Sequence, residues 1–272
     1  MAAIAVPAIW VDRNIVQEDG FVALTAPLGK DPAFQQRLAA AAVNSFSSDQ
    51  IPEPVVELIR PVLEDAAQSL TGLPGYPEAW TEALRKSHRL SFADPASLPA
   101  EMQGTSSLTL DVAPLVGLVA KRVAEATSLP LESPEQVLIT IGQPSQRQIV
   151  EQVSAYAPMG YAVAVGSAIA FLLAFVAAHR RWTVLAGVGA GSLILCAVWT
   201  LAAGAVGGAV EAASSGNAVA DIFKREFVAA STAGFGQWSL AAAVAGAVLL
   251  ALGIVLRVAG GRRRPGSQSA AR

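Results

Sequence analysis

Residues 159–206 read MGYAVAVGSAIAFLLAFVAAHRRWTVLAGVGAGSLILCAVWTLAAGAV, and residues 238–256 read WSLAAAVAGAVLLALGIVL. They contain three apolar stretches, about 159–178, 182–206 and 238–256, with no charged side chain inside any of them. Each is close to the roughly 20 residues that a helix needs to cross a hydrocarbon core about 30 Å thick. A soluble chain of 272 residues has too little interior to bury three helices of this length. The pattern predicts a three-helix transmembrane bundle over 158–260.

Short basic segments mark one side of these stretches. His179–Arg181 joins the first two, and Arg257 and then Arg262–Arg264 follow the third. The segment 207–237 carries no net positive charge. Because Lys and Arg near the ends of spans stay on the cytoplasmic side, 179–181 and the C-terminus are expected inside a plasma membrane. Residues 12–157 and an external loop at 207–237 are then expected outside, and 261–272 forms a basic, disordered cytoplasmic tail.

The start of the chain is hard to reconcile with export of residues 12–157. Met1–Trp10 is mostly apolar, but it is too short for a span and lacks the basic flank of a signal peptide. We interpret residues 1–11 as the remnant of a truncated N-terminal span. The alternative is unaided export of a long N-terminal tail.

The composition of residues 12–157 suits an exported domain without disulfides. It holds 18 Asp or Glu against 10 Lys or Arg, so it lacks the positive charge that a nucleic-acid partner requires. The single cysteine, Cys196, lies within the second apolar stretch, which leaves no intrachain disulfide. A small apolar filler in a helix is the expected role of Cys196.

Helical periodicity dominates the exported domain. We expect helices over 19–28, 31–46, 52–70 and 77–90, the second capped by Asp31-Pro32 and the third kinked at Pro61. The fourth aligns Trp80, Ala83 and Leu84. Strands at 106–112 and 137–141 flank a helix at 114–126, which predicts a small strand-helix-strand element of the βαβ kind. A further helix runs from 145 toward the membrane, with a break expected at Pro158. The expected class is a mainly α membrane protein.

Several segments carry a family resemblance: Phe21–Leu28, Asp31-Pro32, Trp80–His88, Leu108–Pro114 and the Arg180-Arg181 turn. Through these segments the chain resembles a family of uncharacterised actinobacterial integral membrane proteins, and the resemblance covers nearly its whole length. Members have one N-terminal span, an exported domain of this length and three further spans. This chain departs from them at the incomplete first span, in line with a truncated start. The resemblance implies an architecture, and it brings no activity and no site residues.

The residues offer little catalytic chemistry. The two histidines, His88 and His179, cannot build a metal site by themselves, and none of the usual His or Cys spacings of zinc sites occurs. Ser87 precedes His88, but adjacent side chains on a helix diverge and make a poor nucleophile–base pair. We therefore expect no catalytic, cofactor-binding or metal-binding residues, no cofactor and no enzymatic activity.

Small residues recur at four-residue spacing in the apolar stretches. The pairs are Gly187 with Gly191, Ala242 with Gly246, and Ala162 with Gly166. Such pairs let membrane helices approach closely, so they predict helix packing or a homo-oligomer through small-residue faces. The run Gly187–Ser192 resembles a phosphate loop only superficially, because it lacks the lysine and follows no strand.

The segment 207–237 contains a helical apolar pattern. Val219, Ile222, Phe223 and Phe227 recur at i, i+3, i+4 and i+8. Asp221 and Arg225 can pair on the wet side of such a helix. One interpretation is a mobile linker. The other is a short amphipathic helix on the outer membrane boundary or under the exported domain.

Three functional classes remain open. The expected function is a membrane-anchored interaction or scaffold module whose exported helical domain binds an envelope protein. A subunit of a transporter or channel is the first alternative, although the stretches hold only Ser and Thr hydroxyls where a coupled transporter needs ionisable groups. An envelope hydrolase is the second. Besides the lipid bilayer, no partner can be named from the sequence.

Overall fold

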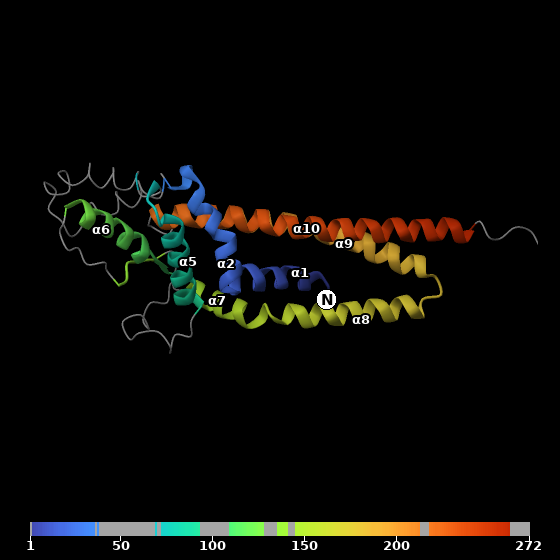
Figure 1. The fold of residues 1–272 in the computed structure, drawn as a ribbon. Helices are drawn as coiled ribbons and strands as arrows, with labels where there is room; N and C mark the ends of the chain where they lie inside the picture. Colours follow the sequence, from blue (N-terminus) through green and yellow to red (C-terminus); the bar gives the residue numbers. More distant parts are fainter. Residues whose placement is uncertain are drawn as a thin grey trace, which may run out of the picture. The chain divides into compact units, whose positions relative to one another are not determined.

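The computed structural model describes residues 2–35, 37, 69, 72–92, 109–127, 135–140, 145–212 and 218–261. This part of the chain is mostly helical and divides into two compact units, whose elements are labelled in Figure 1. The first unit comprises Met1–Ala8, Met159–Val206 and Ala233–Arg272, and the second comprises Ile9–Pro158 and Gly207–Thr232. Apart from Ser69, the helix expected over 52–70 with its kink at Pro61 lies outside the described residues. So do the end of the 31–46 helix and residues 262–272.

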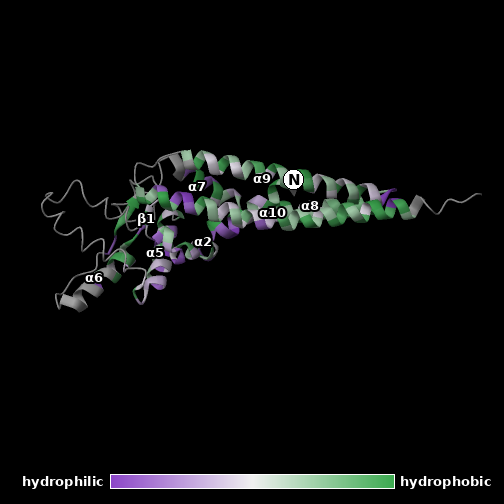
Figure 2. Ribbon diagram, turned by 90° about the horizontal axis from the view of Figure 1, so that it is seen from above, coloured by the Kyte–Doolittle hydropathy of each residue, from purple (hydrophilic) through white to green (hydrophobic). Residues whose placement is uncertain are grey.

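Three helices are long and apolar enough to cross a membrane. The candidate spans are Gln148–Ala177, which includes α8 (Met159–Ala177), Arg181–Val210 in α9 (Arg181–Ala212), and Ala218–Ala259 in α10 (Ala218–Gly261). Figure 2 shows hydrophobic colour along α8, α9 and α10. The three predicted stretches therefore lie on helices whose length and composition suit a membrane-spanning protein. The expected loop at 207–237 is wrong. Its described residues are helical, because α9 continues to Ala212 and α10 already begins at Ala218.

Helices α9 and α10 pack so closely that three of their glycines, Gly189, Gly246 and Gly253, leave no room for a side chain. A Cβ atom at Gly189 would lie 2.5 Å from the Leu250 nitrogen, and one at Gly253 would lie 2.7 Å from the Ala186 nitrogen. At Gly246 a Cβ would lie 2.8 Å from the Cβ of Ser192. Contact between backbones provides van der Waals attraction where lipid removes the hydrophobic driving force.

Within the chain, the predicted pair Gly187 and Gly191 does not form the helix contact of α9. A Cβ at Gly187 or Gly191 would meet nothing within 4 Å, and both residues are exposed. The contact passes instead through Gly189, which lies about 200° around the helix from Gly187 at 3.6 residues per turn. Gly166 of α8 also faces open space. On α10 the expectation holds, since Gly246 packs on Ser192 and the Ser192 hydroxyl donates to the Ala242 carbonyl at 3.3 Å.

The N-terminal helix α1 (Ala2–Val11) contains Pro7. Proline has no N–H, so the carbonyl four residues earlier, at Ala3, loses its helical donor. The indole Nε1 of Trp199 donates to this Ala3 carbonyl at 3.1 Å. An unpaired carbonyl is expensive in an apolar environment, and the Trp199 bond stabilises a helix that Pro7 interrupts.

The second unit is built around a hydrophobic core shared by segments distant in sequence. It includes α2 (Glu18–Thr25), the 3₁₀ helix η2 (Ala26–Lys30), α5 (Tyr76–Phe92) and the start of α10. The core residues are Val22, Phe34, Tyr76, Trp80, Ala83, Leu84, Leu115, Val219, Ile222 and Phe223. The amphipathic helix expected near residue 222 is therefore confirmed under the domain, and the linker interpretation is wrong. Asp221 pairs with Lys224 at 3.1 Å, whereas the expected partner was Arg225.

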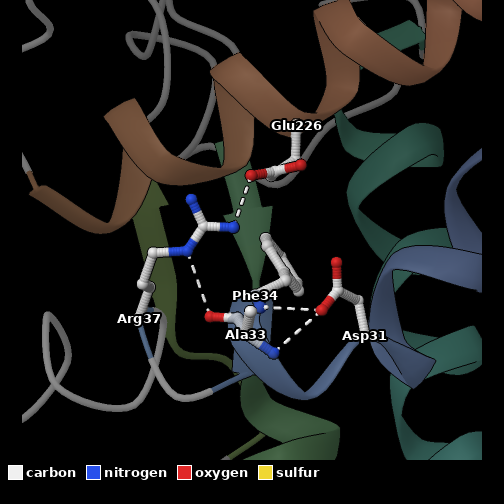
Figure 3. A network of polar contacts seen from close by, with 5 residues as sticks. All are labelled: Asp31, Ala33, Phe34, Arg37 and Glu226. Atoms are coloured by element: carbon white, nitrogen blue, oxygen red, sulfur yellow. Dashed lines mark hydrogen bonds and ion pairs between the residues drawn. The ribbon is translucent and has the colours of Figure 1, made fainter.

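The cap at Asp31 is confirmed. Its Oδ1 accepts hydrogen bonds from the backbone nitrogens of Ala33 at 2.8 Å and Phe34 at 3.3 Å, as Figure 3 shows. The capped turn carries Phe34 into the core, where its ring meets Trp80 edge-on with centroids 5.7 Å apart. Arg37, one turn further on, forms an ion pair of 2.6 Å with Glu226 of α10.

The strand-helix-strand element is present, but its strands are antiparallel. Strand β1 (Thr109–Asp111) pairs with β2 (Leu138–Thr140), and α6 (Ala113–Thr127) lies between them in sequence. The expected βαβ unit requires parallel strands. The two described strands instead pair in opposite directions, with Leu110 opposite Ile139. Helix α7 (Ser145–Tyr156) ends in a turn at Ala157 and Pro158, so the predicted break before α8 is confirmed.

Candidate functional site

His88 of α5 is the most chemically versatile side chain of the second unit. It is buried, and its ring stacks on Phe92, one helical turn later, with centroids 4.3 Å apart. The centroid of the Phe21 ring, in α2, lies 5.1 Å from the centroid of the His88 ring. Its Nε2 lies 3.0 Å from the carbonyl oxygen of Ile15, in the π-helical turn η1 (Asp12–Val16). Because a carbonyl only accepts hydrogen bonds, Nε2 carries the proton and donates it.

Burial keeps this histidine neutral. Removal from water disfavours the charged imidazolium and lowers the pKa of His88 below its ordinary value of 6.5. The Ile15 carbonyl and the nearby Glu18 carboxylate oppose this effect without reversing it. A neutral ring that stacks on Phe92, contacts the tilted ring of Phe21 and bonds to the Ile15 carbonyl fixes α5 against η1.

An ion cluster lies beside the histidine at the start of α2. Glu18 accepts two hydrogen bonds from Arg89, at 2.9 and 3.1 Å, and its Oε1 lies 3.8 Å from the Nε of Arg85. The hydrogen bond from Arg89 lowers the pKa of Glu18 and keeps it ionised. All three side chains are partly exposed, so the cluster orients α2 on α5 more than it stabilises the fold.

A second polar cluster joins α5 to the small sheet. The Ser87 hydroxyl donates to the Ala83 carbonyl at 2.5 Å and accepts from the Asp111 nitrogen at 2.8 Å. The buried carboxylate of Asp111 accepts from the backbone nitrogens of Ala113 at 3.0 Å and Val137 at 3.1 Å. The carboxylate therefore holds the start of α6 and the approach to β2 together.

Ser87, His88 and Asp111 are the residue types of a hydrolytic triad, but they are not arranged as one. Each side chain bonds to a different backbone segment, as expected for Ser87 and His88 at adjacent helix positions. His179 is exposed in the turn before α9, and Cys196 is buried with its Sγ 3.4 Å from the Ser239 carbonyl. Among the described residues, no three His, Cys, Asp or Glu side chains gather to hold a metal ion.

The roles of Asp111 and of the pair formed by Arg37 and Glu226 were not predicted from the sequence. Asp111 had a detectable signal, because an aspartate two positions before a helix commonly bonds to the first free backbone nitrogens. The pair of Arg37 and Glu226 had none, since 189 residues separate its members.

Compared with family models, curated proteins and solved structures, the chain matches none of them.

Proposed function

We propose that this chain is a multi-pass plasma-membrane protein whose second unit is an interaction or scaffold module on the outer face, without catalytic chemistry of its own. One observation carries the proposal. Ile222 and Phe223 of α10 are buried in the same core as Phe34 and Trp80. Residues 9–158 and 207–232 therefore belong to one folded unit, which requires that both segments lie on the same side of a membrane.

The order of the spans agrees with this requirement. Helix α8 leaves the side that holds residues 9–158, α9 returns to it, and α10 leaves again. The turn before α9 and the end of α10 then share the opposite side. In support, the Arg257 guanidinium lies over the Trp182 ring, 4.9 Å from its centroid, so these two ends adjoin. The positive charge at this end favours the cytoplasm for it and the outside for the second unit.

Charge and polar chemistry favour recognition over catalysis. The second unit holds all 21 acidic residues of the chain and 12 of its 19 Lys and Arg, a formal charge of −9. The buried Ser87, His88 and Asp111 are engaged with backbone groups. The net negative charge of this unit suits a partner protein with a basic face.

Site-specific photo-crosslinking in living cells tests the proposal. A photoreactive amino acid is placed at Lys30, Ser69 or Arg225, all exposed in the second unit, in the full chain. The matched control is Ile194 of α9, which is 67% exposed in the span. We expect a discrete protein adduct from the second unit and lipid adducts from Ile194. Absence of protein adducts at all three positions, together with ion flux in liposomes or labelling by hydrolase probes, would contradict the module.

A further inference from the structure

The first unit has an unusual charge distribution. Its residues, 1–8, 159–206 and 233–272, include no Asp or Glu and seven arginines. These are Arg180, Arg181, Arg257, Arg262, Arg263, Arg264 and Arg272. No side-chain carboxylate of this unit can therefore neutralise an arginine, so any counter-charge comes from outside the unit.

Three of these arginines gather at one end of the unit. Arg180 and Arg181 form the junction of α8 and α9, and Arg257 lies near the end of α10. The Arg257 guanidinium lies 4.9 Å from the Trp182 ring centroid, and that of Arg181 lies 5.6 Å from the Phe175 centroid. An aromatic ring attracts the face of a guanidinium but leaves the N–H donors at its edge unused. All three arginines are exposed, so those donors can reach a ligand.

The surroundings of these arginines select the kind of ligand. Large aliphatic side chains next to them are exposed: Leu173 at 65%, Val176 at 72%, Ile254 at 52% and Val255 at 61%. Helix α8 has 19 residues, about 28 Å at 1.5 Å per residue, so if α8 crosses the hydrocarbon core, the arginines that follow it come at the level of lipid phosphates. Guanidinium groups can bind the phosphate of a lipid headgroup, and the neighbouring aliphatic side chains can contact its acyl chains.

We infer that Arg181 and Arg257, with Arg180, form a binding surface for anionic phospholipid headgroups. The partner is a membrane lipid rather than free phosphate, because the exposed aliphatic side chains complete a site only for a ligand with acyl chains. The surface belongs to the membrane unit and needs no partner of the second unit.

Lipid competition on the reconstituted full chain tests this inference. The protein is placed in phosphatidylcholine liposomes with a trace of spin-labelled phosphatidylglycerol or spin-labelled phosphatidylcholine, and the motionally restricted fraction of each label is measured. We expect a preference of about fivefold or more for phosphatidylglycerol, the factor typical of basic residues near an anionic surface. Equal restriction of the two labels would overturn the inference.

Variants assign the preference to these arginines. The double variant Arg181→Gln with Arg257→Gln should lose most of the preference, while Arg181→Lys with Arg257→Lys should keep the larger part. Arg225→Gln, an exposed arginine of the second unit, is the matched control and should leave the ratio unchanged. A control that lowers the ratio equally contradicts the site. So does inorganic phosphate that removes the preference where chloride of equal ionic strength does not. If the glutamine variant fails to fold, the wild-type ratio and the lysine variant decide.

Discussion

The two units are held together by opposite means. In the second unit large aromatic side chains fill the interior, with Trp80 and Phe34 at 1% and 0% exposure. In the first unit the closest contact is between backbones, at Gly189 and Gly246, while leucines such as Leu201 are 75% exposed. In water, burial of large apolar side chains stabilises a fold. Lipid solvates the same side chains, so helices in a membrane associate through close packing at small residues. Identical residue types therefore have opposite roles in the two units.

The largest effect is expected from the aromatic core. Trp80→Ala should destabilise the second unit by about 3–5 kcal/mol, because it removes a buried aromatic side chain and leaves a cavity. Ile194→Ala, on the exposed surface of α9, should change stability little. Denaturant unfolding of the purified protein, followed by near-ultraviolet circular dichroism, measures both. Equal losses for the two variants would remove the distinction between the units.

The backbone contact of the first unit is tested by two neighbouring glycines. Gly189→Ala places a Cβ 2.5 Å from a backbone nitrogen and should cost about 1–3 kcal/mol of bundle stability. Gly187→Ala meets open space and should cost nothing. Melting temperatures in detergent compare them directly. A loss at Gly187 equal to that at Gly189 would show that α9 uses a different face.

The hydrogen bonds of Asp111 are expected to contribute to the stability of the second unit as well. Asp111→Ala leaves the buried nitrogen of Ala113 and the partly buried nitrogen of Val137 without an acceptor, at a cost of about 1–3 kcal/mol. Asp111→Asn retains an oxygen acceptor and should cost less. Denaturant unfolding gives the two losses, and faster amide hydrogen exchange at Ala113 in the alanine variant identifies their cause. Identical losses for alanine and asparagine would assign the effect to the charge instead.

Acid should weaken only the second unit. Since burial lowers the pKa of His88 in the folded state, the unfolded chain binds more protons below pH 6.5. Stability is therefore constant above that pH and falls below it, by at most about 1.4 kcal/mol per pH unit. Glu18, whose pKa is also lowered, adds a second loss below pH 4.5. Melting curves from pH 8 to pH 5 should show the first slope, and His88→Phe should remove it. A slope unchanged in His88→Phe would assign it to another group.

The smallest effect concerns the ion pair between Arg37 and Glu226. Both side chains are partly exposed, at 47% and 23%, so their coupling is expected to be about 0.2–1 kcal/mol. A double-mutant cycle with Arg37→Gln and Glu226→Gln measures the coupling. It should decrease with added salt, and a coupling above this range would give the pair a larger part in holding α10 to the domain.

Much of the helical content could be read from the sequence, because periodicity and capping are local. The three spans, the Asp31 cap and α5 follow from patterns within some 20 residues. Contacts between distant segments could not be derived in this way. The choice of Gly189 over Gly187 depends on the rotation of α9 against α10, and the antiparallel pairing of β1 with β2 joins strands that lie far apart in the sequence. His88 was visible as a residue, but its partner, the Ile15 carbonyl, is set by packing 73 residues away.

Thiol labelling on intact cells tests most directly the claim that residues 9–158 and 207–232 fold together on the outer side. Single cysteines replace Lys30, Arg225 or Arg180 in a Cys196→Ser background, and all three positions are exposed. A membrane-impermeant maleimide should label the cysteines at Lys30 and Arg225, and should label the one at Arg180 only after the membrane is opened. Labelling of just one of the first two, or of Arg180 alone on intact cells, would contradict the account.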